Sequence, residues 1–214
     1  MLHLAFEQNV NDNSEYGNNG VVGAPANVNY VTGKVGKAIQ FKGVDGATEI
    51  TVPNSASLQF NQELTVTYWL RMDSHEGQNG YGSTVSKGIH TIFGKNTDNN
   101  NSMYSYLFTN SGGLNLRIGS QGKSVTSSFA VGEWVYVTQV IFSNNVKIYL
   151  NGVMQVNENL PTAVNFSKAN NENLTIGRLG TDWYPLYGTL DEFRMYNKVL
   201  TDSEILALYQ LKNN

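Results

Sequence analysis

The chain has 214 residues, a hydrophobic fraction of 40%, a charged fraction of 14% and a net charge of −3. The absence of cysteine excludes disulfides and thiolate metal sites. Lys and Arg are scattered, so no basic patch for nucleic acid is visible, and no apolar run approaches the roughly 18 residues of a membrane span. A single β-sandwich domain over residues 1–214 is consistent with this length.

Alternating apolar and polar residues dominate the chain and predict strands. In 64–70, Leu64, Val66, Tyr68 and Leu70 point to one side, and the residues between them point to the other. The segment 134–142 is apolar at both sets of positions, which predicts a central strand covered on both faces. Further strands are expected at 2–7, 37–43, 47–52, 104–109, 114–118, 124–129, 146–150, 153–157, 173–178 and 187–197.

Turn and cap residues separate these segments. Asn151-Gly152 predicts a type I′ hairpin between 146–150 and 153–157. Thr201 with Glu204 forms a capping-box pattern before an apolar helical stripe, and the Gly- and Asn-rich segments 73–88 and 96–102 predict long surface loops. The predicted fold is all-β: a two-sheet antiparallel β-sandwich, or jelly roll, with one short C-terminal helix.

Six sequence blocks follow one another along the chain: Leu4–Phe6 with Asn11–Ser14 and Gly17–Gly20; Gly33–Gly43; Leu64–Leu70; Gly132–Val137; Lys147–Val153; and Gly188–Asn197, followed by the helix of Leu200–Tyr209. In this order the blocks resemble the laminin-G-like jelly-roll domains of the concanavalin A-like lectin/glucanase superfamily. One departure is Tyr136, which stands where that family usually has His.

The resemblance implies two packed antiparallel sheets but leaves the function open, because this fold carries lectins, adhesion modules, hydrolases and spacers. Related glucanases place carboxylates as acid-x-acid-x-acid on one strand, and no such triplet occurs here. Asp191 and Glu192 are adjacent, so they point to opposite faces. The sequence also lacks a nucleophile elbow and a metal-spaced His pair. A glycosidase or polysaccharide lyase is therefore not expected.

The three tryptophans fall into two groups. Trp69 and Trp134 lie within predicted strands, and we expect both to pack in the core. Trp183 follows Gly180-Thr181-Asp182, so it belongs to a loop. Two interpretations stay open for Trp183: an exposed platform for a sugar ring, or a side chain folded back over a sheet edge.

We expect the ligand surface on loops at one rim or on the concave sheet. Trp183 and Tyr184 would form the platform, with Tyr81, Tyr104 and Tyr106 as neighbours. The alternative for Tyr104 and Tyr106 is that both pack inward on a strand. Asp182, Arg178 and the Asn-rich segment 96–101 would supply hydrogen bonds to sugar hydroxyls.

A structural Ca²⁺ is expected near the start of the chain and its last predicted strand. Hard cations take oxygen ligands, and Glu7, Asp12, Asn13 and Asn18 offer them. The resemblance implies that Asp191 faces the same metal. The alternative is that Asp12 and Asn18 form Asx turns and that Asp191 bonds to main chain.

The sequence therefore favours a non-catalytic module of a secreted or cell-surface protein that binds a polysaccharide or a glycoprotein glycan. Protein–protein adhesion and a spacer beside a catalytic domain stay open as alternatives. The first residues lack the order of regions that marks a signal peptide, so we expect a domain cut from a larger protein. We expect no nucleic-acid partner and no membrane insertion.

Overall fold

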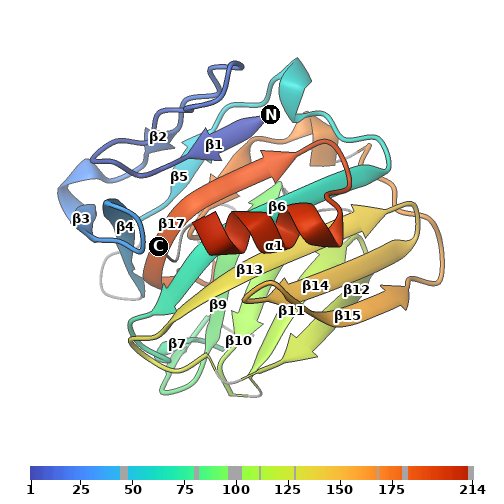
Figure 1. Cartoon of the computed structure of the whole chain (residues 1–214). Coiled ribbons are helices and arrows are strands. Elements are labelled where there is room, and N and C mark those ends of the chain that lie inside the picture. The colour runs from blue at the N-terminus through green and yellow to red at the C-terminus, as the bar shows by residue number, and fades with distance from the viewer. Residues whose placement is uncertain are drawn as a thin grey trace.

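The computed structural model describes residues 1–43, 48–79, 82–95, 103–110, 112–127, 129–167, 169–179 and 183–211. Two antiparallel sheets pack face to face as a sandwich, and one α-helix near the C-terminus lies against one of them (Figure 1). The predicted fold class is confirmed. Among these residues, no helix is both long and apolar enough to cross a membrane.

The first sheet, here called sheet A, has eight strands within the described ranges. Its hydrogen-bonded order is β15-β14-β13-β6-β17-β4-β3, and β1 pairs with β17 beside this path. The strands are β1 (Leu2–Leu4), β3 (Asn29–Thr32), β4 (Lys37–Lys42), β6 (Glu63–Met72), β13 (Trp134–Phe142), β14 (Asn145–Leu150), β15 (Val153–Asn159) and β17 (Tyr187–Tyr196).

The second sheet, sheet B, has nine strands within the same ranges. Its order is β12-β11-β10-β9-β16-β5-β2, and the short β7 and β8 pair beside β9. The strands are β2 (Val21–Val22), β5 (Ile50–Val52), β7 (Gly77–Gln78), β8 (Thr84–Val85), β9 (Ile89–Lys95), β10 (Met103–Phe108), β11 (Gly113–Ile118), β12 (Gln121–Thr126) and β16 (Leu174–Ile176).

Strand β9 is the main element that the sequence did not predict. All seven of its residues are buried, including His90, Thr91 and Lys95, so its two faces show no polar alternation. The Nζ atom of Lys95 is held inside by the Leu58 carbonyl at 2.8 Å and by Asn54 Oδ1 at 3.0 Å. The predicted loop 73–88 is also wrong in part, because it contains the two-residue strands β7 and β8.

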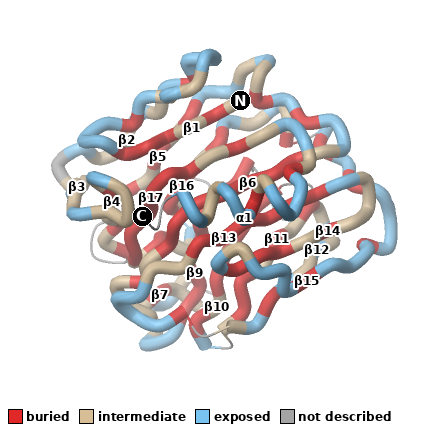
Figure 2. Tube along the Cα trace, viewed as in Figure 1, coloured by how far each residue is buried: buried red, intermediate tan, exposed pale blue. Residues whose placement is uncertain are grey.

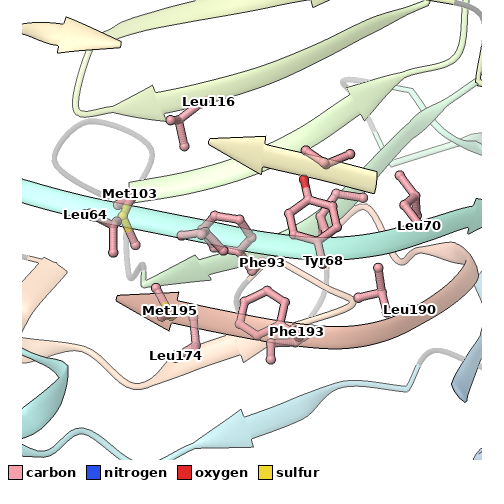
Figure 3. Close-up of a cluster of buried hydrophobic side chains, with 14 of the residues drawn as sticks. Leu64, Tyr68, Leu70, Phe93, Met103, Leu116, Leu174, Leu190, Phe193 and Met195 are labelled. Carbon is pink, nitrogen blue, oxygen red and sulfur yellow. The ribbon is translucent and has the colours of Figure 1, made fainter. Parts of the chain in front are cut away.

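The core is formed by buried side chains from both sheets. Figure 2 shows that buried residues run along the strands, whereas exposed ones gather in the connecting segments. The alternation of β6 is confirmed, because Leu64, Val66, Tyr68 and Leu70 all lie in this core. The Tyr68 ring stacks on Phe193 of β17 with centroids 6.0 Å apart (Figure 3). At about 25 cal/mol per Å² of apolar area, such large buried rings dominate the stabilisation.

The predicted hairpin turn and the predicted helix cap are both present in the structure. Asn151 and Gly152 have φ values of 52° and 76° between β14 and β15, as a type I′ turn requires. Helix α1 (Asp202–Leu211) begins after Thr201. The amide of Glu204 donates to the Thr201 hydroxyl at 3.2 Å, and the amide of Thr201 donates to the Glu204 carboxylate at 2.8 Å. The capping box is therefore confirmed.

Helix α1 lies across the outer face of sheet A, over β6, β13 and β17 (Figure 1). Ile205 of α1 is fully buried and packs with Val140 and Tyr149 of sheet A. Trp69 is 1% exposed and its ring lies 5.7 Å from that of Tyr209, so it packs under the helix and not between the sheets.

The prediction that Trp134 packs in the core is wrong. This residue is only half-buried at the start of β13, and the Arg71 guanidinium lies 5.2 Å from its ring centroid. The cause is its position at a strand end, where one face of the ring is left for a cation–π contact.

Candidate functional site

A pocket lined by aromatic rings lies on the outer face of sheet B. Tyr104, Tyr106 and Phe108 alternate along β10 and share one face, whereas Met103 and Leu107 point into the core. The Tyr104 and Tyr106 rings stack with centroids 5.3 Å apart, and Phe108 meets Tyr106 edge-on at 5.0 Å. Strand alternation therefore places three rings in a row.

The opposite wall of the pocket comes from the segment between β16 and β17. Leu179 and Trp183 exchange backbone hydrogen bonds of 2.9 and 3.2 Å, which hold these two residues side by side. The next residue, Tyr184, has a positive φ of 53°. Its amide donates to Gln78 Oε1 at 2.8 Å, and its carbonyl accepts from the Thr91 amide at 2.9 Å. These bonds fix the Tyr184 side chain at the pocket.

The cavity has a volume of about 310 Å³, at the lower end of the range in which small ligands bind. Its lining combines the rings of tyrosine and phenylalanine with two aliphatic side chains, one threonine and one arginine. The lining residues are Ile89, Thr91, Tyr104, Tyr106, Phe108, Arg117, Leu179 and Tyr184.

Two phenols of the pocket, those of Tyr104 and Tyr184, stay neutral at physiological pH. Burial raises the pKa of Tyr104 and of Tyr184 above the usual value for a tyrosine. A neutral phenol both donates and accepts a hydrogen bond, which suits a sugar hydroxyl. The lining residues within the described part of the chain include no carboxylate and no histidine.

The structure brings together three of the predicted ligand residues, namely Tyr104, Tyr106 and Tyr184. Trp183 is 48% exposed, and its ring lies 5.8 Å from that of Tyr184, next to the pocket but outside its lining. Arg178 is not part of the lining, because its guanidinium pairs with Glu49 at 3.4 Å.

Tyr81, Asp182 and the predicted loop 96–101 lie outside the described residues. The sequence analysis missed Ile89, Thr91, Phe108, Arg117 and Leu179. Phe108 follows Tyr104 and Tyr106 at the same period of two, so the alternation alone could have found it. The others depend on which strands become neighbours.

The predicted calcium ligands Asp12 and Asn18 contact each other near the N-terminus. The Asp12 carboxylate accepts amide hydrogens from His3, Ser14 and Asn18 at 2.8–2.9 Å, and the Ser14 hydroxyl at 2.8 Å. Burial acts to raise the pKa of Asp12, but these hydrogen bonds outweigh it and lower that pKa. A bound cation would have to replace some of these hydrogen bonds.

Two more of the predicted ligands, Glu7 and Asp191, contact one turn formed by residues 33–37. Glu7 accepts the Lys37 amide at 3.1 and 3.2 Å, and Asp191 Oδ2 accepts the Val35 amide at 2.8 Å. Asp191 is fully buried, and burial raises its pKa to about 7. The described residues contain no cluster of three or more His, Cys, Asp or Glu side chains suited to a metal. The calcium ion stays a prediction.

The fold and the site together describe a jelly-roll sandwich with an open aromatic pocket on one sheet. The profile of the concanavalin A-like lectin/glucanases superfamily matches residues 44–206, most of the chain. The chain therefore belongs to this superfamily. A search of curated proteins found no match.

Among solved structures, the chain is similar to domain 4 of AbnA, a GH43 extracellular arabinanase from Geobacillus stearothermophilus in complex with arabinotriose. The TM-score is 0.73 and the identity 22%, over 98% of this chain and 97% of that one.

Two toxin structures show the same fold. The binding domain of botulinum neurotoxin DC in complex with rat synaptotagmin II has a TM-score of 0.72 and 17% identity, over 99% of this chain and 51% of that one. The binding domain of Paraclostridial Mosquitocidal Protein 1 has a TM-score of 0.71 and 20% identity, over 97% and 51%. The chain thus spans about half the length of these toxin domains. At these identities the likeness shows the fold alone.

Proposed function

We propose that this chain is a carbohydrate-binding module of a secreted or cell-surface protein and that it holds a glycan in the aromatic pocket of sheet B. The observation that carries the proposal is the convergence of Tyr104, Tyr106, Phe108 and Tyr184 around one cavity of about 310 Å³. Pyranose and furanose rings have apolar C–H faces that pack on aromatic rings, while their hydroxyls need hydrogen-bonding partners.

The pocket supplies both kinds of contact. The rings offer apolar surface. The neutral phenols of Tyr104 and Tyr184 and the Thr91 hydroxyl offer polar atoms. Stacking and a few hydrogen bonds give weak binding to one sugar, with Kd of about 1 μM to 1 mM. Repeated domains or repeated epitopes would raise the avidity.

The comparisons support the proposal without reaching this chain's own ligand. Domain 4 of AbnA was solved with arabinotriose and belongs to an extracellular enzyme. Cell entry of botulinum neurotoxin type C, another relative of this fold, depends on interaction with two ganglioside molecules. The pocket lining within the described residues has no carboxylate, whereas glycoside hydrolysis uses a pair of them. Binding therefore suits this pocket better than catalysis.

The test is a glycan array followed by titration calorimetry on the best-bound oligosaccharide. We expect Tyr184→Ala to weaken binding at least tenfold, because the ring forms one wall of the pocket. The matched control is Phe142→Ala, which removes an aromatic side chain that is 52% exposed on sheet A. The control should bind like the unmodified protein.

A third variant, Trp183→Ala, asks whether the neighbouring exposed indole extends the platform. Circular dichroism checks that each variant is folded. If no glycan binds, or if folded Tyr184→Ala binds as tightly as the unmodified domain, the pocket is not a glycan site. Silence on the array combined with capture of a protein by the same pocket would favour the adhesion alternative.

A further inference from the structure

Arg117 is placed at the aromatic pocket by the register of sheet B. It lies on β11 between Tyr104 of β10 and Gly122 of β12, which are its cross-strand partners. A Cβ atom at Gly122 would lie 2.9 Å from Arg117 Cγ, so the glycine leaves room for the arginine side chain. The side chain lines the cavity, and Nη2 donates to the Ser120 carbonyl at 3.2 Å.

Arg117 differs from the other arginines of the chain because no described carboxylate pairs with its guanidinium. Arg71, Arg178 and Arg194 each pair with a carboxylate, at 2.9, 3.4 and 2.6 Å. Arg117 forms no ion pair with any described residue, although the chain has 17 acidic and 14 basic residues. Its guanidinium therefore brings a positive charge to the pocket that no described carboxylate neutralises.

Thr91 provides a second, independent observation on the same pocket. It lies in β9, is fully buried and lines the cavity, and its hydroxyl has no hydrogen-bond partner among the described residues. A buried hydroxyl without a partner costs about 1–3 kcal/mol, so such a group is expected to find a partner in a ligand. Among the described residues, the pocket thus offers a guanidinium and hydroxyls but no anionic acceptor.

We propose that the pocket is specific for acidic sugars, whose carboxylate or sulfate group is bound by Arg117 while the sugar ring packs on the tyrosines. This inference rests on the proposed function and adds the class of ligand. A guanidinium presents its N–H groups as a planar fork that matches the two oxygens of a carboxylate, and it matches two oxygens of a sulfate similarly. The bond to Ser120 restrains the guanidinium at the edge of the pocket.

The experiment uses an array of matched sugars. Each neutral oligosaccharide is paired with a hexuronate or sialylated form that carries a carboxylate, and with an O-sulfated form. Titration calorimetry then compares the best acidic glycan and its neutral counterpart. The variants are Arg117→Gln, which removes the charge, and Arg117→Lys, which keeps the charge but loses the planar fork. The control is Lys147→Gln, which removes the same charge from β14 on the other sheet.

We expect the acidic glycan to bind about 10- to 100-fold more tightly than its neutral counterpart. Arg117→Gln should abolish this preference, measured as the ratio of the two Kd values within the same variant, and Arg117→Lys should restore only part of it. Added salt should weaken the acidic glycan more than the neutral one. The array arms separate the two sources of charge, since a carboxylate site prefers the uronate or sialylated member and a sulfate site the sulfated one.

The outcomes that would overturn the inference differ from those that would overturn the proposed function. Equal binding of neutral and acidic glycans, or an unchanged preference in folded Arg117→Gln, rejects the acidic specificity and leaves a neutral-glycan module. Loss of the preference in Lys147→Gln as well would assign it to net charge and not to Arg117. Silence across the whole array rejects both proposals.

Discussion

The outer faces of the two sheets carry similar side chains but differ in what covers them. On sheet A, Trp69, Tyr136 and Tyr149 lie beneath α1 and its Tyr209. On sheet B, the rings of Tyr104 and Tyr106 line a cavity, and no helix within the described ranges lies over them.

The difference shows that the cover, and not the strand pattern, decides whether an aromatic face becomes core or surface. The chain completes the face of sheet A with its own C-terminal helix, so that face adds to stability. On sheet B the rings line a cavity instead, and a concave site that combines rings with a few polar groups is typical of ligand binding. We therefore expect substitutions on the covered face of sheet A to change stability, and substitutions on the open face of sheet B to change ligand binding.

The largest effect on stability is expected from truncating the side chain that packs α1 against sheet A. Ile205→Ala deletes a fully buried side chain between α1 and sheet A, and should lower the free energy of unfolding by about 2–5 kcal/mol. Leu206→Ala is the control on the same helix, because Leu206 is 42% exposed and its loss should cost about 0.5 kcal/mol. Urea unfolding measures both; equal small effects would show that α1 contributes little to the covered face.

A calcium ion bound at Asp191 would stabilise sheet A further. Asp191 lies opposite Trp69 in the strand register and accepts a hydrogen bond from the turn of residues 33–37. At a calcium concentration of 100 times Kd, binding stabilises by about 2.7 kcal/mol. We therefore expect the melting temperature to fall on chelation and recover with Ca²⁺, and Asp191→Asn to weaken this response. An identical melting temperature with chelator and with Ca²⁺ would contradict the metal site.

Acid is expected to loosen the open face first, through His90. This residue is fully buried in β9 between Ile89 and Thr91 of the pocket, and burial lowers its pKa to about 4. An unfolded chain titrates near 6.5, so between pH 6.5 and 4 it binds a proton that the folded protein does not. The His90 contribution to the free energy of unfolding therefore falls as the pH falls through this window, by at most about 1.4 kcal/mol per pH unit.

His90→Asn tests this origin, because an amide oxygen can replace Nδ1 as acceptor for the Tyr187 amide, now at 3.2 Å. The variant should lose less stability than the unmodified protein between pH 6.5 and 4.5 in urea titrations. Hydrogen exchange should show β9 opening before β13 in acid. Parallel pH curves for the two proteins would rule out His90 as the source.

The smallest effect is expected at the helix cap. Thr201→Ala removes the hydroxyl that accepts the Glu204 amide, and should cost about 1 kcal/mol. Ser203→Ala, at an exposed position two residues along in the first turn of α1, is the control and should change stability little. Glycan binding on sheet B should be the same in both variants, since the cap stabilises only the covered face. A cap variant that lost glycan binding would show that the two faces are coupled.

The sequence by itself determined the local structure. Alternation in 64–70 and 134–142, the Asn151-Gly152 turn and the Thr201–Glu204 cap predicted the sandwich, one hairpin and the helix, because each depends on near neighbours in the chain. Part of the pocket was also predicted, namely Tyr104, Tyr106 and Tyr184 of its lining.

Tertiary structure decided the rest. It brought Tyr184 to Tyr104, 80 positions away, and placed Arg117 beside both, because strand order and register are set by packing of the whole sandwich. It put Trp69 under α1, left Trp134 half-exposed, and buried His90 and Lys95 in a strand with no sequence signal. Side-chain pairing across distant strands has no counterpart in local periodicity, and that pairing creates both the pocket and its unneutralised charge.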